Sequence, residues 1–216
     1  MKKVFYLKGL SSDEEELKYL MEKFRKNDID LIPLVTDYKD ISGSSKYELV
    51  RFLSDMIGVF KEGEVNIICH SMGCNIGLLL ANSLDNIDHL IFISPEFIPI
   101  TKTEQKFIVE STRESKYKSK KSRISISKIK SLLLFLKSKK WVNEELKDFL
   151  HKNIDTSVIY SKGDKYVSRN QIDRLSRVSS IECYEIDSNN HNPLLEETDA
   201  IELIKNQLED VKVIRL

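Results

Sequence analysis

Hydrophobic and polar positions follow two alternating spacings along this chain. Short apolar runs rich in β-branched residues predict buried strands, over about 3–7, 30–35, 65–68, 89–95, 154–160 and 181–186. Between these runs apolar residues recur every three or four positions, which predicts helices over about 12–26, 47–60, 77–81, 169–177 and 197–209. Ser12 and Glu15 have the spacing of a capping box at the start of the first helix.

Strands that alternate with helices favour a parallel sheet covered on both faces. We therefore expect an α/β fold of three layers, α/β/α, around an open, mostly parallel sheet of six strands. A length of 216 residues suits one domain with a sizeable core, so we expect a single domain over 1–216. Residues 211–214 are expected to form either an edge strand or a docked tail.

One segment, 101–153, interrupts this alternation. Between 101 and 140 it carries thirteen lysines and arginines against three glutamates, a local charge of +10 in a chain whose formal net charge is zero. Because the total is zero, no global field would attract nucleic acid, and we expect no nucleic-acid partner. An apolar stripe is expected beside the lysines, made of Ile126, Ile129, Leu132, Leu133, Leu136 and Trp141.

The remaining composition narrows the class of protein. Apolar residues make up 41% and charged residues 31%, as in ordinary globular domains. The apolar run at the N-terminus ends at Lys8, which is too short for a signal peptide or a membrane span. Cys69, Cys74 and Cys183 have neither metal-site nor disulfide spacing, so we expect buried thiols in a reducing cytoplasm. No phosphate-binding loop or metal-ligand cluster stands out, and we expect no cofactor.

The stretch from Val65 to Ala81 contains the strongest chemical signal. It begins as an expected strand, ends as an expected helix, and has Cys69-His70-Ser71-Met72-Gly73 at the turn between them. Such a turn lifts a serine hydroxyl above the end of a sheet, and crowding there requires small residues two positions before and after the serine. Gly73 meets the second need, and Cys69 stands where the usual pattern has glycine.

This stretch resembles the nucleophile elbow of the α/β-hydrolase family, in which the sequence His-Ser-Met-Gly is common. The resemblance covers nearly the whole chain and is that of a minimal member without the first, antiparallel strands of larger ones. It implies that Ser71 is the nucleophile of a Ser-His-Asp triad. His191, in the polar loop after the last expected strand, stands where the family places its base. His70 is expected to point away from Ser71, while His89 and His151 lie before strands.

The resemblance also implies an acid and two oxyanion donors. The stretch 158–167 resembles the family's Gly-x-x-Asp-x-x-Val ending, which makes Asp164 the acid, with Glu96 as the main rival and Asp187 as a further candidate. The backbone N–H groups of Met72 and Leu10 would form the oxyanion hole. Lys8 replaces the histidine that usually orders the loop before Leu10. We expect Lys8 to be solvated, with contact to an acidic substrate group as the alternative.

The family often inserts a lid before the strand that carries the acid, so the resemblance implies a small, mostly helical, basic lid over about 101–153. Beyond a plain solvated lid, its charge suggests docking to an anionic membrane surface or to an acidic carrier protein. The function implied is hydrolysis of a small-molecule carboxylic ester or thioester by an acyl-enzyme. The alternative is a non-catalytic or weakly catalytic ligand- or partner-binding protein with the same fold, which the departures at Cys69 and Lys8 keep open.

Overall fold

The structure is a computed structural model, and it describes residues 1–10, 12–59, 63, 65–97, 126–152, 154–178, 180–196 and 199–209, with only the backbone of 126–129. Six strands form one sheet in the order β2-β1-β3-β4-β5-β6, and every neighbouring pair is parallel. The strands are β1 (Lys2–Leu7), β2 (Ile29–Pro33), β3 (Val65–His70), β4 (Ile87–Ile93), β5 (Asp155–Ser161) and β6 (Ile181–Ile186). The expected six-stranded α/β sheet is therefore confirmed, and it is wholly parallel.

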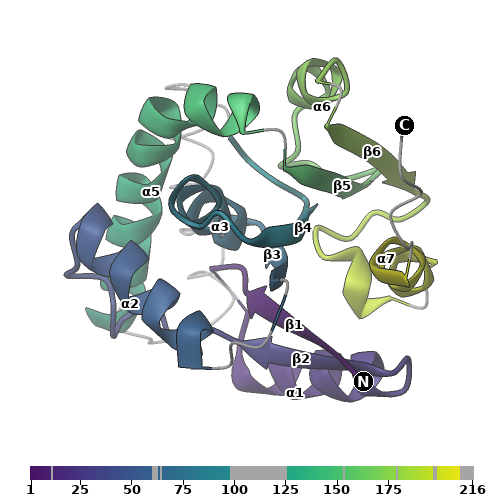
Figure 1. The fold of residues 1–216 in the computed structure, drawn as a ribbon, viewed down its shortest axis with the longest axis horizontal. Coiled ribbons are helices and arrows are strands. Elements are labelled where there is room, and N and C mark those ends of the chain that lie inside the picture. The colour runs from purple at the N-terminus through teal and green to yellow at the C-terminus, as the bar shows by residue number, and fades with distance from the viewer. Residues whose placement is uncertain are drawn as a thin grey trace, which may run out of the picture.

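Helices cover both faces of this sheet (Figure 1). They are α1 (Glu14–Arg25), α2 (Lys46–Val59), α3 (Met72–Ser83), α5 (Ile126–His151), α6 (Arg169–Leu175) and α7 (Ala200–Glu209), with a short 3₁₀ turn η1 (Pro193–Leu195). One core holds apolar side chains of α2, α3, α5 and α6, and the other holds those of α1 and α7. The three-layer α/β/α arrangement is thus the one that the alternation predicts.

The first helix begins one residue later than its capping box predicts. Asp13 is the N-cap, and its Oδ1 accepts the N–H of Glu16 at 2.9 Å. The Ser12 hydroxyl instead donates to the carboxylate of Glu16 at 2.6 Å. Aspartate caps a helix as well as serine does, so the sequence alone does not choose between the two registers. The possible edge strand or tail at 211–214 lies outside the described residues.

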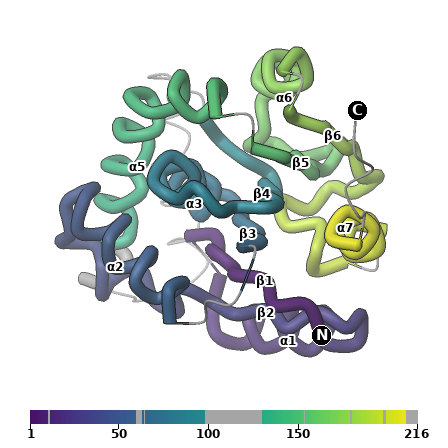
Figure 2. Tube along the Cα trace, in the orientation of Figure 1, coloured from purple at the N-terminus to yellow at the C-terminus, as the bar shows by residue number. Residues whose placement is uncertain are grey.

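Helix α5 forms the part of the expected lid, 101–153, that the structure describes. Residues 126–151 form one helix that packs along α3 as part of the helical layer, and Figure 2 shows α3 between α5 and strands β3 and β4. The expected apolar stripe is also out of phase. Leu133 and Leu136 are exposed, whereas Leu134, Phe135 and Val142 are buried. The first part of the expected lid, 98–125, lies outside the described residues.

Two side-chain contacts fix the register of α5 on α3. The Asn75 amide donates to the Ser138 hydroxyl at 3.1 Å, and one full heptad later the Asn82 amide donates to the Glu145 carbonyl at 3.0 Å. The positions increase together on both helices, so the two chains run in the same sense where the helices touch.

The parallel sheet brings several loops to one edge. In a parallel sheet all carboxyl ends lie on the same side, where ligands of open α/β folds bind. Ser71 directly follows β3, Ser94 follows β4, Asp164 lies three residues after β5, and His191 lies in the loop after β6. These four residues therefore lie at the same edge of the sheet.

Candidate active site

Ser71 sits in a strained turn between β3 and α3. Its backbone dihedrals are φ 51° and ψ −116°, and its N–H donates to the Ile93 carbonyl at 2.9 Å. A positive φ is costly for a residue with a Cβ, and such strain is typical of functional sites. The turn is tight because Gly73 lies against β1: a Cβ at Gly73 would be 2.2 Å from the Leu7 carbonyl oxygen. The turn presents the Ser71 side chain at the carboxyl edge of the sheet.

Cys69 fits the position where the usual pattern has glycine because a glycine stands opposite it. Its side chain is fully buried beneath α3, and a Cβ built on Gly77 would be 2.3 Å from the Cys69 Sγ. The thiol therefore occupies the space that the missing side chain of Gly77 leaves free. The absence of a side chain at Gly77 in α3 therefore compensates for the larger residue at position 69.

Ser71, His191 and Asp164 lie in hydrogen-bonding sequence. His191 Nε2 is 2.8 Å from the Ser71 Oγ, and His191 Nδ1 is 2.8 Å from an Asp164 carboxylate oxygen. A carboxylate can only accept, so Nδ1 carries the proton of a neutral imidazole. Nε2 then has a free lone pair that accepts from the Ser71 hydroxyl. This tautomer is the one that a general base acting on serine requires.

The Asp164 carboxylate is held and buried. Its side chain has 0% exposure, and its Oδ1 accepts the Tyr166 N–H at 2.8 Å. Burial alone would raise the pKa of this carboxyl. The hydrogen bond and charge interaction with His191, together with the Tyr166 N–H, lower the pKa by more than burial raises it, so the net pKa is below its ordinary value. Asp164 is thus ionised opposite the imidazole at neutral pH.

Two contacts hold the loop that carries His191. The Ser161 hydroxyl donates to the Asn190 carbonyl at 2.6 Å, and the Gly163 N–H donates to the Ser188 carbonyl at 2.9 Å. The exposed Tyr166 ring stands edge-on to the imidazole with centroids 5.0 Å apart. The loop after β5 and the loop after β6 are therefore fastened to each other.

His70 has a place in this site that its sequence position did not suggest. Its ring is 4% exposed and stands 5.2 Å from the His191 ring, centroid to centroid. His70 Nε2 donates to the His191 carbonyl at 3.3 Å, and Nδ1 is buried without a hydrogen-bond partner among the described residues. Burial, followed by the charge of His191, lowers the pKa of His70 to about 3. His70 is therefore a neutral support for the base loop.

Ser94 is the second residue that the sequence left without a role. It follows β4 with φ 48° and is fully buried. Its hydroxyl contributes to lowering the pKa of Asp164, although its geometry falls short of a hydrogen bond to any described residue. A positive φ at a serine leaves no trace in the pattern of apolar and polar positions, so only the structure reveals it.

The other candidates for acid or base lie elsewhere. The Glu96 carboxylate pairs with Lys139 of α5 at 3.0 Å, and Asp187 is exposed. His89 lies near two carboxylates, 3.5 Å from that of Asp88. His151 is exposed at the end of α5. Of the carboxyl groups weighed as the acid, only Asp164 contacts His191 among the described residues.

The loop after β1 lies beside Ser71, as the expected oxyanion hole requires. A Cβ on Gly9 would be 3.4 Å from the Ser71 Cβ, which places the adjoining Leu10 close to the serine. Met72 is the first residue of α3, and the N–H at that position has no acceptor within the helix. Met72 and Leu10 therefore remain the expected oxyanion donors, one beside Ser71 in the chain and one in the loop next to it.

The expectation that Lys8 is solvated is wrong. Its side chain is buried, and its Nζ donates to the Ser12 carbonyl at 2.5 Å. Burial lowers the pKa of this ammonium group. On the other side, the Tyr38 hydroxyl donates to the Lys8 carbonyl at 2.5 Å. Lys8 thus fastens the loop that carries Leu10, which is the ordering task of the histidine that it replaces.

Neither a metal cluster nor a membrane span occurs in the part of the chain that the structure describes. No three His, Cys, Asp or Glu side chains there are grouped so that they could hold a metal ion. No described helix combines the length and apolar character needed to cross a bilayer.

Comparisons with solved structures find the same fold in known hydrolases. A carboxylesterase of the archaeon Nitrososphaera gargenis matches 96% of this chain and 89% of its own, with a TM-score of 0.69 and 11% identity. The carboxylesterase CesB of Bacillus subtilis matches 96% and 82%, with a TM-score of 0.61 and 14% identity. The thioesterase domain of the curacin biosynthetic pathway matches 96% and 90%, with a TM-score of 0.60 and 10% identity. No protein-family model and no curated protein matches the sequence.

Proposed function

Because this chain has the α/β-hydrolase fold, we propose that it is a serine hydrolase that cleaves a small-molecule carboxylic ester or thioester. One observation carries the proposal: the Ser71 Oγ lies 2.8 Å from His191 Nε2 while Asp164 lies 2.8 Å from His191 Nδ1. The carboxylesterases and the thioesterase that share the fold support the same reaction class.

Acylation uses these three side chains together. The Ser71 Oγ attacks the acyl carbon as its proton passes to His191 Nε2, and the ionised Asp164 stabilises the imidazolium that forms. The N–H groups of Met72 and Leu10 donate to the oxyanion. When the tetrahedral adduct collapses, the bond to the leaving alcohol or thiol breaks, and His191 returns the proton to that oxygen or sulfur.

Deacylation repeats the sequence with water. Neutral His191 takes a proton from water, the hydroxide attacks the acyl-enzyme, and Ser71 leaves with the proton that His191 returns. No step in this scheme requires a cofactor. All three cysteines are free, which accords with the proposed reducing cytoplasm.

The alternative of a binding protein without catalysis rested on two departures from the family pattern. The Cys69 thiol is accommodated by Gly77, and Lys8 holds its loop through Ser12, so both departures are compatible with an intact serine site. Docking of an acidic carrier protein or an anionic membrane to the basic segment 101–140 has no described contact in its favour.

A covalent label tests the proposal directly. A fluorophosphonate should label Ser71 of the wild-type chain, and both Ser71→Ala and His191→Ala should lower turnover of p-nitrophenyl esters or acyl-thioesters by several orders of magnitude. Because the members of a triad act as a unit, the double variant should be little slower than either single one. Folded protein that stays unlabelled, or a Ser71→Ala variant with wild-type turnover, contradicts the proposal.

A further inference from the structure

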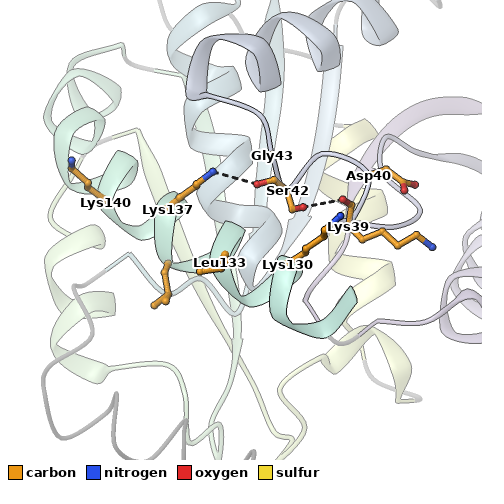
Figure 3. Close-up of a pocket in the computed structure, with 9 residues that line it drawn as sticks. Lys39, Asp40, Ser42, Gly43, Lys130, Leu133, Lys137 and Lys140 are labelled. Atoms are coloured by element: carbon orange, nitrogen blue, oxygen red, sulfur yellow. Dashed lines mark hydrogen bonds between the residues drawn. The ribbon is translucent and has the colours of Figure 1, made fainter. Parts of the chain in front are cut away.

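A pocket of about 760 Å³ lies between helix α5 and the loop 39–43 (Figure 3). Neither Ser71, His191 nor Asp164 lines it, so it is separate from the candidate active site. Its volume is in the range of sites that hold small organic molecules. The side chains of its walls determine which class of molecule it could hold.

The polar part of the wall is strongly basic. Lys130, Lys137 and Lys140 come from α5, Lys39 comes from the loop, and one carboxylate, that of Asp40, stands among them. Lys39 is paired with Asp37 at 2.7 Å, and Lys137 donates to the Ser42 carbonyl at 3.3 Å, as the dashed line in Figure 3 shows. In the described residues Lys130 and Lys140 take part in no ion pair. These two lysines are ten positions apart, about 15 Å along the helix, so one small anion can reach only one of them. Figure 3 shows Lys130 pointing toward the loop and Lys140 pointing away from it, which leaves the ammonium group of Lys130 for an anion.

The apolar part of the wall comes from two leucines of the same helix. Leu133 is 52% exposed and Leu136 is 45% exposed. The core contacts of α5 are made on its other side by Leu134, Phe135 and Val142, so these two leucines are not needed to dock the helix. Lysines and leucines at positions 130, 133, 137 and 140 share one face of α5 at helical spacing.

The pocket lies toward the edge of the sheet that carries Ser71. The loop 39–43 follows the carboxyl end of β2, and neighbouring Tyr38 donates to Lys8 in the loop after β1. The loop that lines the pocket therefore lies on the same side of the sheet as Ser71.

We propose that this pocket binds a single-chain amphiphile with an anionic head group. A phosphate or carboxylate lies against the ammonium group of Lys130, and the alkyl chain lies along Leu133 and Leu136. One helix face offers both apolar contact and positive charge. Inorganic phosphate could use only the charge, and an uncharged detergent could use only the apolar contact. This inference goes beyond the proposed function, because binding at the pocket does not depend on a reactive Ser71.

Titration calorimetry with monomeric dodecyl phosphate on the full chain tests the proposal. The wild type should bind it at least about tenfold more tightly than inorganic phosphate or dodecyl maltoside, since each of these lacks one half of the match. Lys130→Glu should weaken binding about tenfold, and Leu133→Asn about fivefold. The matched control is Lys147→Glu, an equal charge change at an exposed position of the same helix outside the pocket, which should stay within about twofold of wild type.

The variants change exposed side chains, and circular dichroism checks that each one is folded. Equal weakening by Lys147→Glu would mean that net charge alone governs binding, and it would overturn the proposal. Dodecyl phosphate binding that survives both pocket variants would assign the ligand to another site and would also overturn it. So would vesicles of anionic lipid that bind in a Lys130-dependent manner while monomeric dodecyl phosphate does not, because the occupant would then be a membrane surface.

Discussion

At the scale of single residues, the roles of Asp164 and Glu96 can be separated by isosteric changes. Asp164→Asn removes the charge but keeps the shape, and it favours the wrong histidine tautomer, so kcat should fall by about 10⁴-fold. Glu96→Gln should leave kcat nearly unchanged, because that carboxylate pairs with Lys139. Steady-state rates on one ester substrate suffice. The reverse ranking of the two variants would reassign the acid.

His70 should make the fold sensitive to acid. Its pKa of about 3 lies below the 6.5 of an unfolded histidine, so the unfolded chain binds the extra proton first. Its contribution is complete above pH 6.5 and is lost as pH falls toward 3, at about 1.4 kcal/mol per pH unit. The pKa of Asp164 is lowered in the folded state, so its contribution to the stability of the fold is also lost in acid, as pH falls toward that pKa.

Replacing His70 by glutamine isolates its share. Urea unfolding between pH 7 and 4 should show a flatter pH dependence for His70→Gln than for wild type, while the Asp164 contribution remains in both. His151→Gln is the control, because His151 is exposed and near none of the active-site groups. Parallel curves for wild type and His70→Gln would mean that His70 is not buried neutral.

At the scale of elements, the pairing of Cys69 with Gly77 predicts a strong coupling between β3 and α3. Gly77→Ala should destabilise the protein by about 1–3 kcal/mol, since its Cβ would meet the Cys69 Sγ. The same change at Gly58, where nothing lies within 4 Å of an added Cβ, should stabilise α2 by about 0.5–1 kcal/mol.

A double-mutant cycle shows whether the thiol is the cause. In a Cys69→Ala background the Sγ is gone, and Gly77→Ala should lose most of its cost. Denaturant midpoints of the four proteins measure this. A cost that persists in the Cys69→Ala background would locate the crowding elsewhere, for example at Phe92, whose ring lies 3.5 Å from the added Cβ.

Helix α5 shows where sequence patterns stop being informative. Residues 132–136 are five apolar residues in a row, so the buried face cannot be chosen from their spacing. The choice is made by polar contacts to another helix, between Asn75 and Ser138 and between Asn82 and Glu145. Strands β3 and β4, by contrast, were predictable because a parallel strand buried within the sheet is largely an apolar run.

In the candidate site, too, some residues could be predicted from the sequence and others could not. Ser71, Asp164 and His191 could be singled out from the sequence because each follows an expected strand in a recognisable motif. His70 and Ser94 could not, since their contributions depend on a ring contact and on a positive φ. Lys8 was assigned to solvent because lysine usually is solvated, and its burial depends on the Ser12 carbonyl that the loop presents.

At the scale of the whole molecule, charge is divided unevenly. Residues 101–140 carry +10 while the remainder carries −10, so the neutral total hides a strongly basic segment. Anionic substrates should therefore be guided toward the basic end of α5, and kcat/KM for an ester with a carboxylate in its acyl chain should fall about fivefold from low to high salt. A neutral ester of equal length should hardly respond.

The triple variant Lys130→Glu, Lys137→Glu and Lys140→Glu provides the check. It should remove the salt dependence for the anionic ester and keep wild-type rates on the neutral one. A salt series on both substrates and both proteins makes the comparison. If salt acts equally on the two esters, the uneven charge has no part in substrate capture.

The contact between Ser71 and His191 spans 120 positions of the chain. On a ribosome the elbow and β3 emerge long before the loop after β6, and domains take shape from the N-terminal side as they are made. The serine therefore spends most of synthesis without its base, and a chain cut short before residue 191 carries an elbow that cannot be activated. On the proposed function, reactivity toward acyl groups arises only once the loop after β6 has joined the elbow.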